Sequence, residues 1–493
     1  MVFEPSELKI LDKTWRFDED NSIYIAQKSF LFDNIKLFNA DQFIALNGTI
    51  SPDPNEMLGL EIHNVNLDFF NTLSTKEFSG LANGNFGFTN FYESIGVNGQ
   101  INVDELYINN FLVGNIDAAT FIADKLVNVE ISNTRNGKKV IAIDGFLGST
   151  DNQLNLNAKL NEADLSVLEP FLSNYITRMG GTVSGDFDIT GSLAFPVVIG
   201  YGLVSGGTLL VNYLKTQYTV DGNLIFNNNE ISFRELTLKD SNGNRARMRG
   251  GISHDYFSDF ILDISSNLDN FQVLNTGSRD NDQFYGTAYV TGTLNIFGAA
   301  NNLDITARAT SQKNTRIYIP LGSKSYEAQE EFIKIINVLD TARNISLEET
   351  IDKLDISNVR MNFTFDVTPD AYTEIQIDPR TGETIQGRGR GVLTMNIDTQ
   401  GNFSMLGNYE ITEAKYNFSL YNILRKEFIV QPGGRISWFG DPYEGVMDIN
   451  AYYLESVSLQ SLQTNQNAAL EDPAMRRRFP LKVLMNLKGQ LLS

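Results

Sequence analysis

The residues of this chain best suited to chemistry are carboxylates, two histidines and one glycine-arginine segment. Asp255, Asp259 and Asp263 recur at a regular spacing, and carboxylate oxygens are the ligands that calcium prefers. A calcium loop also needs a central glycine and a terminal glutamate, and neither stands at the required position. Asp280 and Asp282 have the surroundings of a solvated loop. The carboxylates therefore predict no calcium site.

The segment Gly387-Arg388-Gly389-Arg390-Gly391 is the second candidate, because glycine-rich loops can cradle phosphate. Such a cradle needs the backbone amides at the start of a following helix. The sequence after Gly391 alternates as a strand does, and no helix follows. We therefore expect a flexible turn that leads into a strand from Val392.

Other reactive side chains are scarce. The chain has no cysteine, which excludes disulfides, thiolate metal sites and cysteine nucleophiles. His63 and His254 are the two histidines, and their polar surroundings predict ordinary surface residues. The sequence contains no Walker loop, no GxSxG elbow and no HExxH motif. It therefore predicts a protein that is not an enzyme and that uses no metal or cofactor.

The charge balance restricts the partners. A net charge of -21 makes the surface acidic, so it repels phosphate backbones, and we expect no nucleic-acid partner. The cluster Arg476-Arg477-Arg478 is best interpreted as the solvated end of a loop. No apolar run reaches the roughly 18 residues of a membrane-spanning helix. The N-terminal residues lack the pattern of a signal peptide, so an export signal is expected outside this chain.

Alternating apolar and polar residues dominate the chain and predict strands. Leu154 to Leu160 alternates strictly, as does Leu393 to Asp398. Strict alternation gives a strand one apolar face and one wet face. Turn pairs such as Asn98-Gly99 and Asn242-Gly243 separate these runs without long helices between them. The fold class predicted is therefore all-β, an elongated antiparallel meander with few short helices.

A glycine-marked pattern recurs about every hundred residues, at Gly84, Gly185 and Gly286. A second, more degenerate set begins at Gly48, Gly145 and Gly251 and ends in a short apolar turn or helix. Repeats of this kind stack one structural unit along an axis, so their core is long. The period exceeds that of ordinary solenoids, and each unit is therefore expected to be a multi-stranded segment of sheet.

Helices are predicted at three places only. Leu67 to Leu73 and Asp164 to Tyr175 are short candidates. Tyr326 to Leu339 is the clearest, because its apolar residues recur at helical spacing. The polar segment Gln463 to Asp472 is predicted to be a loop.

The segment Gly391 to Tyr453 carries a specific pattern of aromatic residues and glycines. It resembles the C-terminal domain of the TamB family, in the AsmA-like group of envelope proteins. The most specific element is a Gly-Asp-Pro turn after a tryptophan, followed by a returning strand. The residues that carry the resemblance are Gly407, Tyr409, Tyr416, Phe418, Trp438, Gly440, Asp441 and Pro442.

The resemblance implies an elongated repeating β-groove, also called a β-taco, whose inner face is apolar. It suggests groove segments over residues 1–380 and a TamB-type C-terminal β-domain over residues 381–493. Family members carry an N-terminal membrane anchor and extend slightly further at the C-terminus. The chain is therefore expected to be a C-terminal portion, truncated at its end, of a protein anchored in the inner membrane and located in the periplasm of a Gram-negative bacterium.

The function implied is transport of phospholipid between the inner and outer membranes, with acyl chains lying in the groove. The alternative is a scaffold for the assembly of outer-membrane proteins, acting with a BamA-family, TamA-like barrel. Periodicity alone allows the apolar residues to line an open groove or to fill a closed sandwich core. The groove candidates are Leu154, Leu156, Leu160, Phe260, Leu262, Ile264, Leu393, Met395, Ile397, Phe403, Met405, Tyr416 and Phe418.

Overall fold

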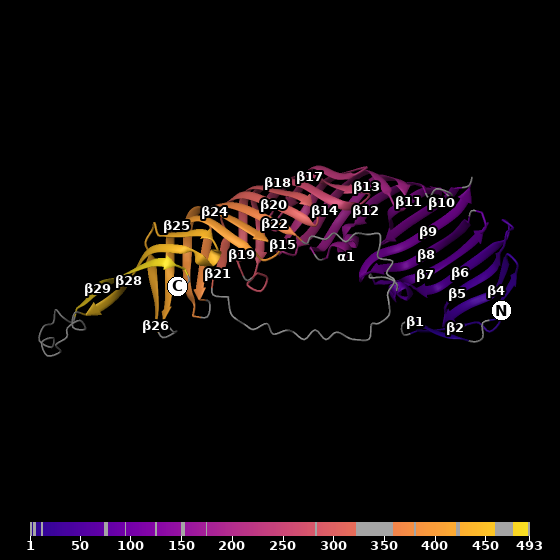
Figure 1. The fold of residues 1–493 in the computed structure, drawn as a ribbon, viewed down its shortest axis with the longest axis horizontal. Helices are drawn as coiled ribbons and strands as arrows, with labels where there is room; N and C mark the ends of the chain where they lie inside the picture. The colour runs from indigo at the N-terminus through magenta and orange to yellow at the C-terminus, as the bar shows by residue number, and fades with distance from the viewer. Residues whose placement is uncertain are drawn as a thin grey trace.

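The structure is a computed structural model that forms one long, arched sheet, whose strands cross the long axis of the molecule (Figure 1). It describes residues 2, 6–10, 13–72, 77–93, 95–123, 126–148, 153–173, 175–281, 283–321, 358–378, 381–420, 424–458 and 477–491. In these ranges, 29 strands are joined in the one sheet. The all-β, elongated architecture expected from the alternating sequence is confirmed.

The strands follow one another along the chain with few other elements between them. The first twelve are β1 (Glu7–Ile10), β2 (Lys13–Phe17), β3 (Ser22–Ala26), β4 (Ser29–Asn39), β5 (Gln42–Ile50), β6 (Met57–Asn66), β7 (Phe78–Thr89), β8 (Gly96–Ile108), β9 (Phe111–Ala123), β10 (Leu126–Arg135), β11 (Lys138–Gly148) and β12 (Gln153–Asp164). The next are β13 (Ile176–Ser192), β14 (Pro196–Val211), β15 (Thr216–Asn227), β16 (Glu230–Lys239), β17 (Arg245–Asp255), β18 (Ser258–Thr276), β19 (Tyr285–Ala299), β20 (Asn302–Ser311) and β21 (Arg316–Pro320). The last are β22 (Val359–Val367), β23 (Tyr372–Asp378), β24 (Glu383–Asp398), β25 (Phe403–Leu420), β26 (Leu424–Val430), β27 (Arg435–Gly440), β28 (Val446–Ser458) and β29 (Arg478–Gln490).

The strands from β3 to β20 form the predicted antiparallel meander, in which each strand pairs with the next along the chain. Two pairs depart from it, because β20 pairs with β22 and β21 pairs with β23 in parallel. β24 then pairs antiparallel with both β22 and β23. β25 in turn pairs with both β26 and β27, and these two strands both pair with β28. Alternation of apolar residues is the same in parallel and antiparallel strands, so the sequence could not reveal this change of direction.

The repeat corresponds to six strands. Gly84, Gly185 and Gly286 lie in β7, β13 and β19, each six strands after the previous one. Gly48, Gly145 and Gly251 lie in β5, β11 and β17, with the same spacing. One unit of about a hundred residues is therefore three hairpins, as a multi-stranded repeat requires. Strands on both sides of residues 380 and 381 belong to the same sheet, and the domain boundary suggested there stays a prediction.

Helices are short, as expected. The described ones are η1 (Leu67–Thr72), η2 (Leu165–Leu168), α1 (Glu169–Leu172) and η3 (Pro442–Glu444). The first three fall within the two short helices predicted from the sequence. The predicted helix Tyr326 to Leu339, the predicted loop Gln463 to Asp472 and Arg476 lie outside the described residues. Among the helices that the structure describes, none has the length and apolar character needed to cross a bilayer.

The glycine-arginine segment is a strand and not the flexible turn that we expected. Gly387 to Gly391 lies inside β24. A Cβ atom on Gly389 would come within 2.4 Å of the ring of Tyr409, which lies on β25 two residues before Ile411, the residue opposite Gly389. The glycines are therefore required by the close approach of neighbouring side chains, and the prediction of a turn was wrong because no alternating pattern of side-chain sizes marks such a strand.

Candidate functional site

One face of the sheet carries apolar rows that pass from strand to strand. Residues directly opposite each other in register share a face, so a row can be followed across the pairings. One such row crosses from β18 to β25 and consists of Ile264, Ile296, Ile305, Met361, Ile397 and Phe403. We call this side of the sheet the apolar face.

The predicted groove residues all belong to the apolar face. Leu154, Leu156 and Leu160 alternate along β12, and Phe260, Leu262 and Ile264 alternate along β18. Leu393, Met395 and Ile397 lie on β24 opposite Gly407, Met405 and Phe403 of β25. Tyr416 and Phe418 continue the same face further along β25, beyond a bulge that keeps them in phase.

The sheet curls towards the apolar face. Tyr218 of β15 and Phe271 of β18 stack with ring centroids 4.9 Å apart, although β16 and β17 separate their strands in the sheet. The Tyr218 hydroxyl donates a hydrogen bond of 2.8 Å to the carbonyl of Gln272, and burial raises the pKa of Tyr218 to about 12. A side chain on one strand can reach the third strand beyond it only on the concave side of a strongly curved sheet.

In the first half of the chain, the concave apolar face stays partly exposed. A row across β6 to β11 consists of Ile62, Gly84, Ile101, Ala118, Ile131 and Ile143. Its four isoleucines are half-buried. An apolar side chain that keeps accessible surface inside a concave sheet can cover a ligand, and this part therefore has the properties of a groove.

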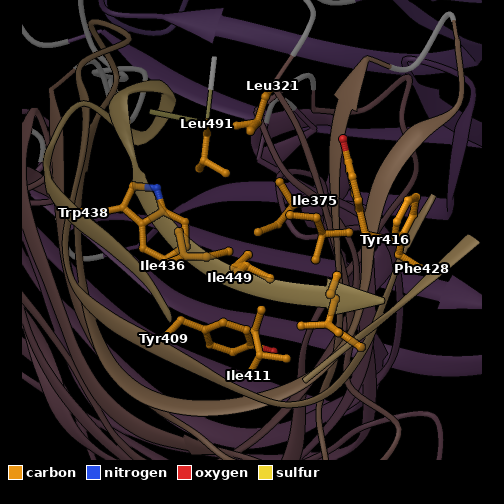
Figure 2. Packing of buried hydrophobic residues seen from close by; sticks show 14 of the residues in the cluster. Leu321, Ile375, Tyr409, Ile411, Tyr416, Phe428, Ile436, Trp438, Ile449 and Leu491 are labelled. Carbon is orange, nitrogen blue, oxygen red and sulfur yellow. The ribbon is translucent and has the colours of Figure 1, made fainter. Parts of the chain in front are cut away.

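At the C-terminal end, the same face is filled by its own side chains. Ile411, Ile436 and Ile449 are fully buried and pack together with Trp438 and Phe428. Figure 2 shows these side chains converging from several strands inside the curved sheet. The sequence left an open groove and a filled core as alternatives, and this end of the molecule is a packed core.

The predicted groove residues divide between these environments. Met405 and Tyr416 are buried in the C-terminal cluster, and Leu393, Met395 and Phe418 pack against it. Ile397 is buried in a neighbouring cluster that Leu262, Met395 and Phe403 also touch. Of the remaining candidates, Leu154, Leu156 and Leu160 lie on β12 beside the open part, and Phe260 and Ile264 lie on β18 on either side of Leu262. Leu154 is buried and the other four are half-buried.

The residues of the Gly-Asp-Pro pattern have a structural role. The indole N–H of Trp438 donates a hydrogen bond of 3.0 Å to the carbonyl of Pro442. The Asp441 carboxylate accepts one of 2.8 Å from the amide of Tyr443 and so caps η3. Gly440 ends β27 directly before this turn, and Gly407 lies opposite Trp438. The pattern therefore fixes the turn that returns the chain into β28.

Ionisable groups near the apolar face are few and engaged. Tyr416 donates a hydrogen bond to Glu383. The pKa of the Tyr416 phenol is raised, mainly by burial and to a smaller extent by this contact with Glu383. His254 is only 6% exposed and stacks on Phe257. The prediction of a surface histidine was therefore wrong for His254. Its burial also lowers its pKa. His63 stacks on Phe43 on the opposite, polar face. Within the described ranges, no three acidic or histidine side chains are grouped so as to hold a metal ion.

Sequence reasoning missed the residues that bend and cover the sheet. Tyr218, Phe271 and Asp240 were not singled out, although all three are buried where β15 approaches β18. The Asp240 carboxylate accepts hydrogen bonds from the amides of Gln272, Asn242 and Asn244. The one signal in the sequence was the third copy of the degenerate repeat, which ends at Leu274. In the structure this copy continues as strand, whereas the other two copies end in short helices.

Comparison with known families identifies one match. The family model described as the TamB C-terminal domain matches residues 232–493, which is slightly more than half of the chain. Searches of curated proteins and of solved structures each gave no match.

Proposed function

Because this chain belongs to the TamB C-terminal domain family, which is associated with the translocation and assembly module of the Gram-negative envelope, we propose that it carries phospholipid between membranes. The acyl chains lie against the apolar face where it is open, and the headgroup stays in water. The observation that carries this proposal is the half-buried isoleucine row across β6 to β11, which leaves apolar surface accessible inside a concave sheet.

The energetics favour such a role. Each methylene group removed from water is worth about 0.8 kcal/mol, so a two-chain lipid crosses an aqueous gap very slowly unaided. A concave apolar face that extends over many strands lowers this barrier at every position along the path. The transfer makes and breaks no covalent bond, so the protein acts without being an enzyme.

The location and the attachment to membranes are part of the same proposal. A path for lipid between two membranes requires the periplasm as its compartment. It also requires attachment to the inner membrane, which the family resemblance implies. The lipid then leaves near the outer membrane, where a TamA-like barrel is the expected partner.

One observation favours the second candidate function, docking to an outer-membrane barrel during protein assembly. Among the described residues, β29 pairs with β28 alone, and the hairpin of these two strands projects from the end of the sheet (Figure 1). Leu454 and Leu484 are strongly exposed on this hairpin. A strand edge of this kind can accept a strand from another protein.

A transfer assay with purified chain and two vesicle populations tests the proposed function. Fluorescent phospholipid starts in the donor vesicles, and its arrival in the acceptor vesicles is followed over time. We expect transfer in proportion to protein concentration and without any barrel partner, because the apolar face alone shields the acyl chains. Transfer no faster than the spontaneous rate would contradict lipid transport and leave barrel docking as the better account.

A further inference from the structure

We propose that the two long edges of the sheet have different roles, one as a lateral portal for acyl chains and the other as a closed edge. This inference rests on the proposed function and adds the route by which a lipid reaches the apolar face. In an antiparallel meander, successive turns alternate between the two edges. The turns after β3, β5, β7, β13, β17 and β19 therefore lie on one edge, the first edge. Those after β4, β6, β12, β14, β16 and β18 lie on the second edge.

The first edge exposes large apolar side chains at turn after turn. Leu193 in the turn after β13 is 70% exposed, and Phe195 in the same turn is 59% exposed. Ile25 and Ile95 stand beside the turns after β3 and β7, and Ile122 stands at the same edge near the end of β9. Soluble proteins rarely leave such side chains in water over a long surface, and where they do, the surface meets an apolar partner.

Contacts between turns hold this apolar edge together without burying it. The Phe195 ring meets the Tyr256 ring at 5.2 Å, which joins the turns after β13 and β17. The Tyr92 hydroxyl donates a hydrogen bond of 2.7 Å to the carbonyl of Lys28, which joins the turns after β7 and β3. The edge is therefore a connected border and not a set of isolated loop tips.

The second edge is covered by segments that fold back over the sheet. After β12, η2 contacts β9, and Asp164 at its start forms an ion pair of 2.8 Å with Arg135. After the kink at Asn270, the end of β18 reaches the turn after β14, where the amide of Asn275 donates to the carbonyl of Leu214 at 2.9 Å. These covering segments stand six strands apart, once in each repeat.

A third covering segment follows β6, six strands before η2. Here η1 is tied to the first strands of the sheet by Lys13, whose ammonium group lies 3.0 Å from the Asp68 carboxylate. The side chain of Asn71 exchanges hydrogen bonds with the backbone of Phe78 at the start of β7. In each repeat, a segment held by backbone or charged groups therefore covers part of the second edge, where Phe70, Leu168 and Tyr213 keep exposed surface.

The apolar face continues without a break to the first edge. Leu58 at the start of β6 lies opposite Phe88 at the end of β7, which in turn lies opposite Val97 at the start of β8. Ile122 and Val127 form the equivalent pair across β9 and β10. An apolar chain that crosses the first edge at these strands thus passes from one apolar surface directly to the next. Two buried polar atoms lie on the same face near this edge, the Thr120 hydroxyl of β9 and Nε2 of His254 on β17.

The distribution of the exposed side chains identifies the occupant as the acyl chains of a two-chain lipid. A folded protein partner would need these side chains gathered in one patch, whereas they extend along the edge from β3 to the turn after β13. An acyl chain needs only a narrow apolar border at whichever position it enters. The carboxylates of Glu56, Glu93 and Asp255 stand among the turn residues, so an anionic surface would be repelled, whereas neutral tails are not.

Two triple variants test the portal. The first places aspartate along the first edge, as Ile95→Asp/Leu193→Asp/Phe195→Asp. The matched control places the same charge on exposed residues of the second edge, as Phe70→Asp/Leu168→Asp/Tyr213→Asp. Uptake of fluorescent phospholipid from vesicles is followed by stopped flow, and the amount bound at equilibrium is measured separately. Circular dichroism shows whether both variants keep the strand content of the parent.

We expect lipid uptake by the first-edge variant to be about tenfold slower than uptake by the parent. The amount of lipid bound at equilibrium should be unchanged, because the apolar face itself is intact. The second-edge control is expected to stay within about twofold of the parent. Equal slowing of both variants, or no slowing of either, would overturn the portal while leaving lipid binding in place. A parent chain that binds no lipid at equilibrium would instead refute the proposed function, and the portal with it.

Discussion

Replacement of Trp438 by alanine is expected to destabilise the C-terminal end of the sheet by about 3–5 kcal/mol. The indole is only 3% exposed and packs among Ile436, Ile449 and Tyr409. Its loss leaves a large cavity and also removes the hydrogen bond to the Pro442 carbonyl. Hydrogen exchange of the β25 and β28 amides reports this loss directly, and we expect it to accelerate by at least about a hundredfold.

The neighbouring residue supplies the control. Phe439 is also aromatic but is 77% exposed on the opposite face, so Phe439→Ala is expected to change stability by no more than about 0.5 kcal/mol. Trp438→Phe keeps one aromatic ring but loses the N–H donor and part of the packing, so it should lose about 1–3 kcal/mol. Because a repeating sheet is held by neighbouring contacts, amides of β9 to β12 should exchange at the parent rate in all three variants. Equal protection in Trp438→Ala and Phe439→Ala would show that this cluster is not the core that the structure indicates.

The double variant Ile101→Asp/Ile131→Asp is expected to lose at least about nine-tenths of its bound phospholipid while keeping its fold. Both side chains are half-buried on the open part of the apolar face, so a carboxylate there retains contact with water in the empty protein. An acyl chain laid over the same carboxylates would strip that water away without offering a hydrogen bond. Lipid phosphorus per chain, measured after incubation with vesicles and removal of the vesicles, reports the loss.

The control for this variant introduces the same charge on the other face. Gln100→Asp/Ser132→Asp changes the residues next in sequence, whose side chains point to the polar face. It is expected to bind as much lipid as the parent. If both double variants bind equally well, acyl chains do not lie on the apolar face across β8 and β10.

The sequence was sufficient for most of the strands and for the repeat, because period-two alternation reports them directly. It was wrong at two turns, since Asn98-Gly99 lies inside β8 and Gly387 to Gly391 lies inside β24. Leu154 to Leu160 and Leu393 to Ile397 were placed on one face without the structure. Whether a charged or histidine side chain is buried was harder to predict from the sequence. His254 alternates with polar neighbours as a surface residue would, yet it is buried because the turn after β17 brings Phe257 onto its ring.

What the sequence could not predict is where the apolar face is open and where it is filled. Ile101 and Ile411 occupy equivalent positions in alternating strands, yet one is half-buried and the other fully buried. The difference arises from the curvature of the sheet, which depends on bulges and on contacts between strands that are distant in sequence. Tyr218 and Phe271 illustrate this, since only their stacking shows how tightly the sheet curls between them.

The central claim is that the apolar face holds acyl chains, and counting the lipids bound to the purified chain tests it most directly. The chain is incubated with phospholipid vesicles, separated from them and analysed by native mass spectrometry, which gives the mass of each bound molecule. We predict that part of the parent chain carries one or more intact two-chain phospholipids. In Ile101→Asp/Ile131→Asp, we predict that this lipid-bound population is lost. A correctly folded parent chain that carries no lipid would contradict the account.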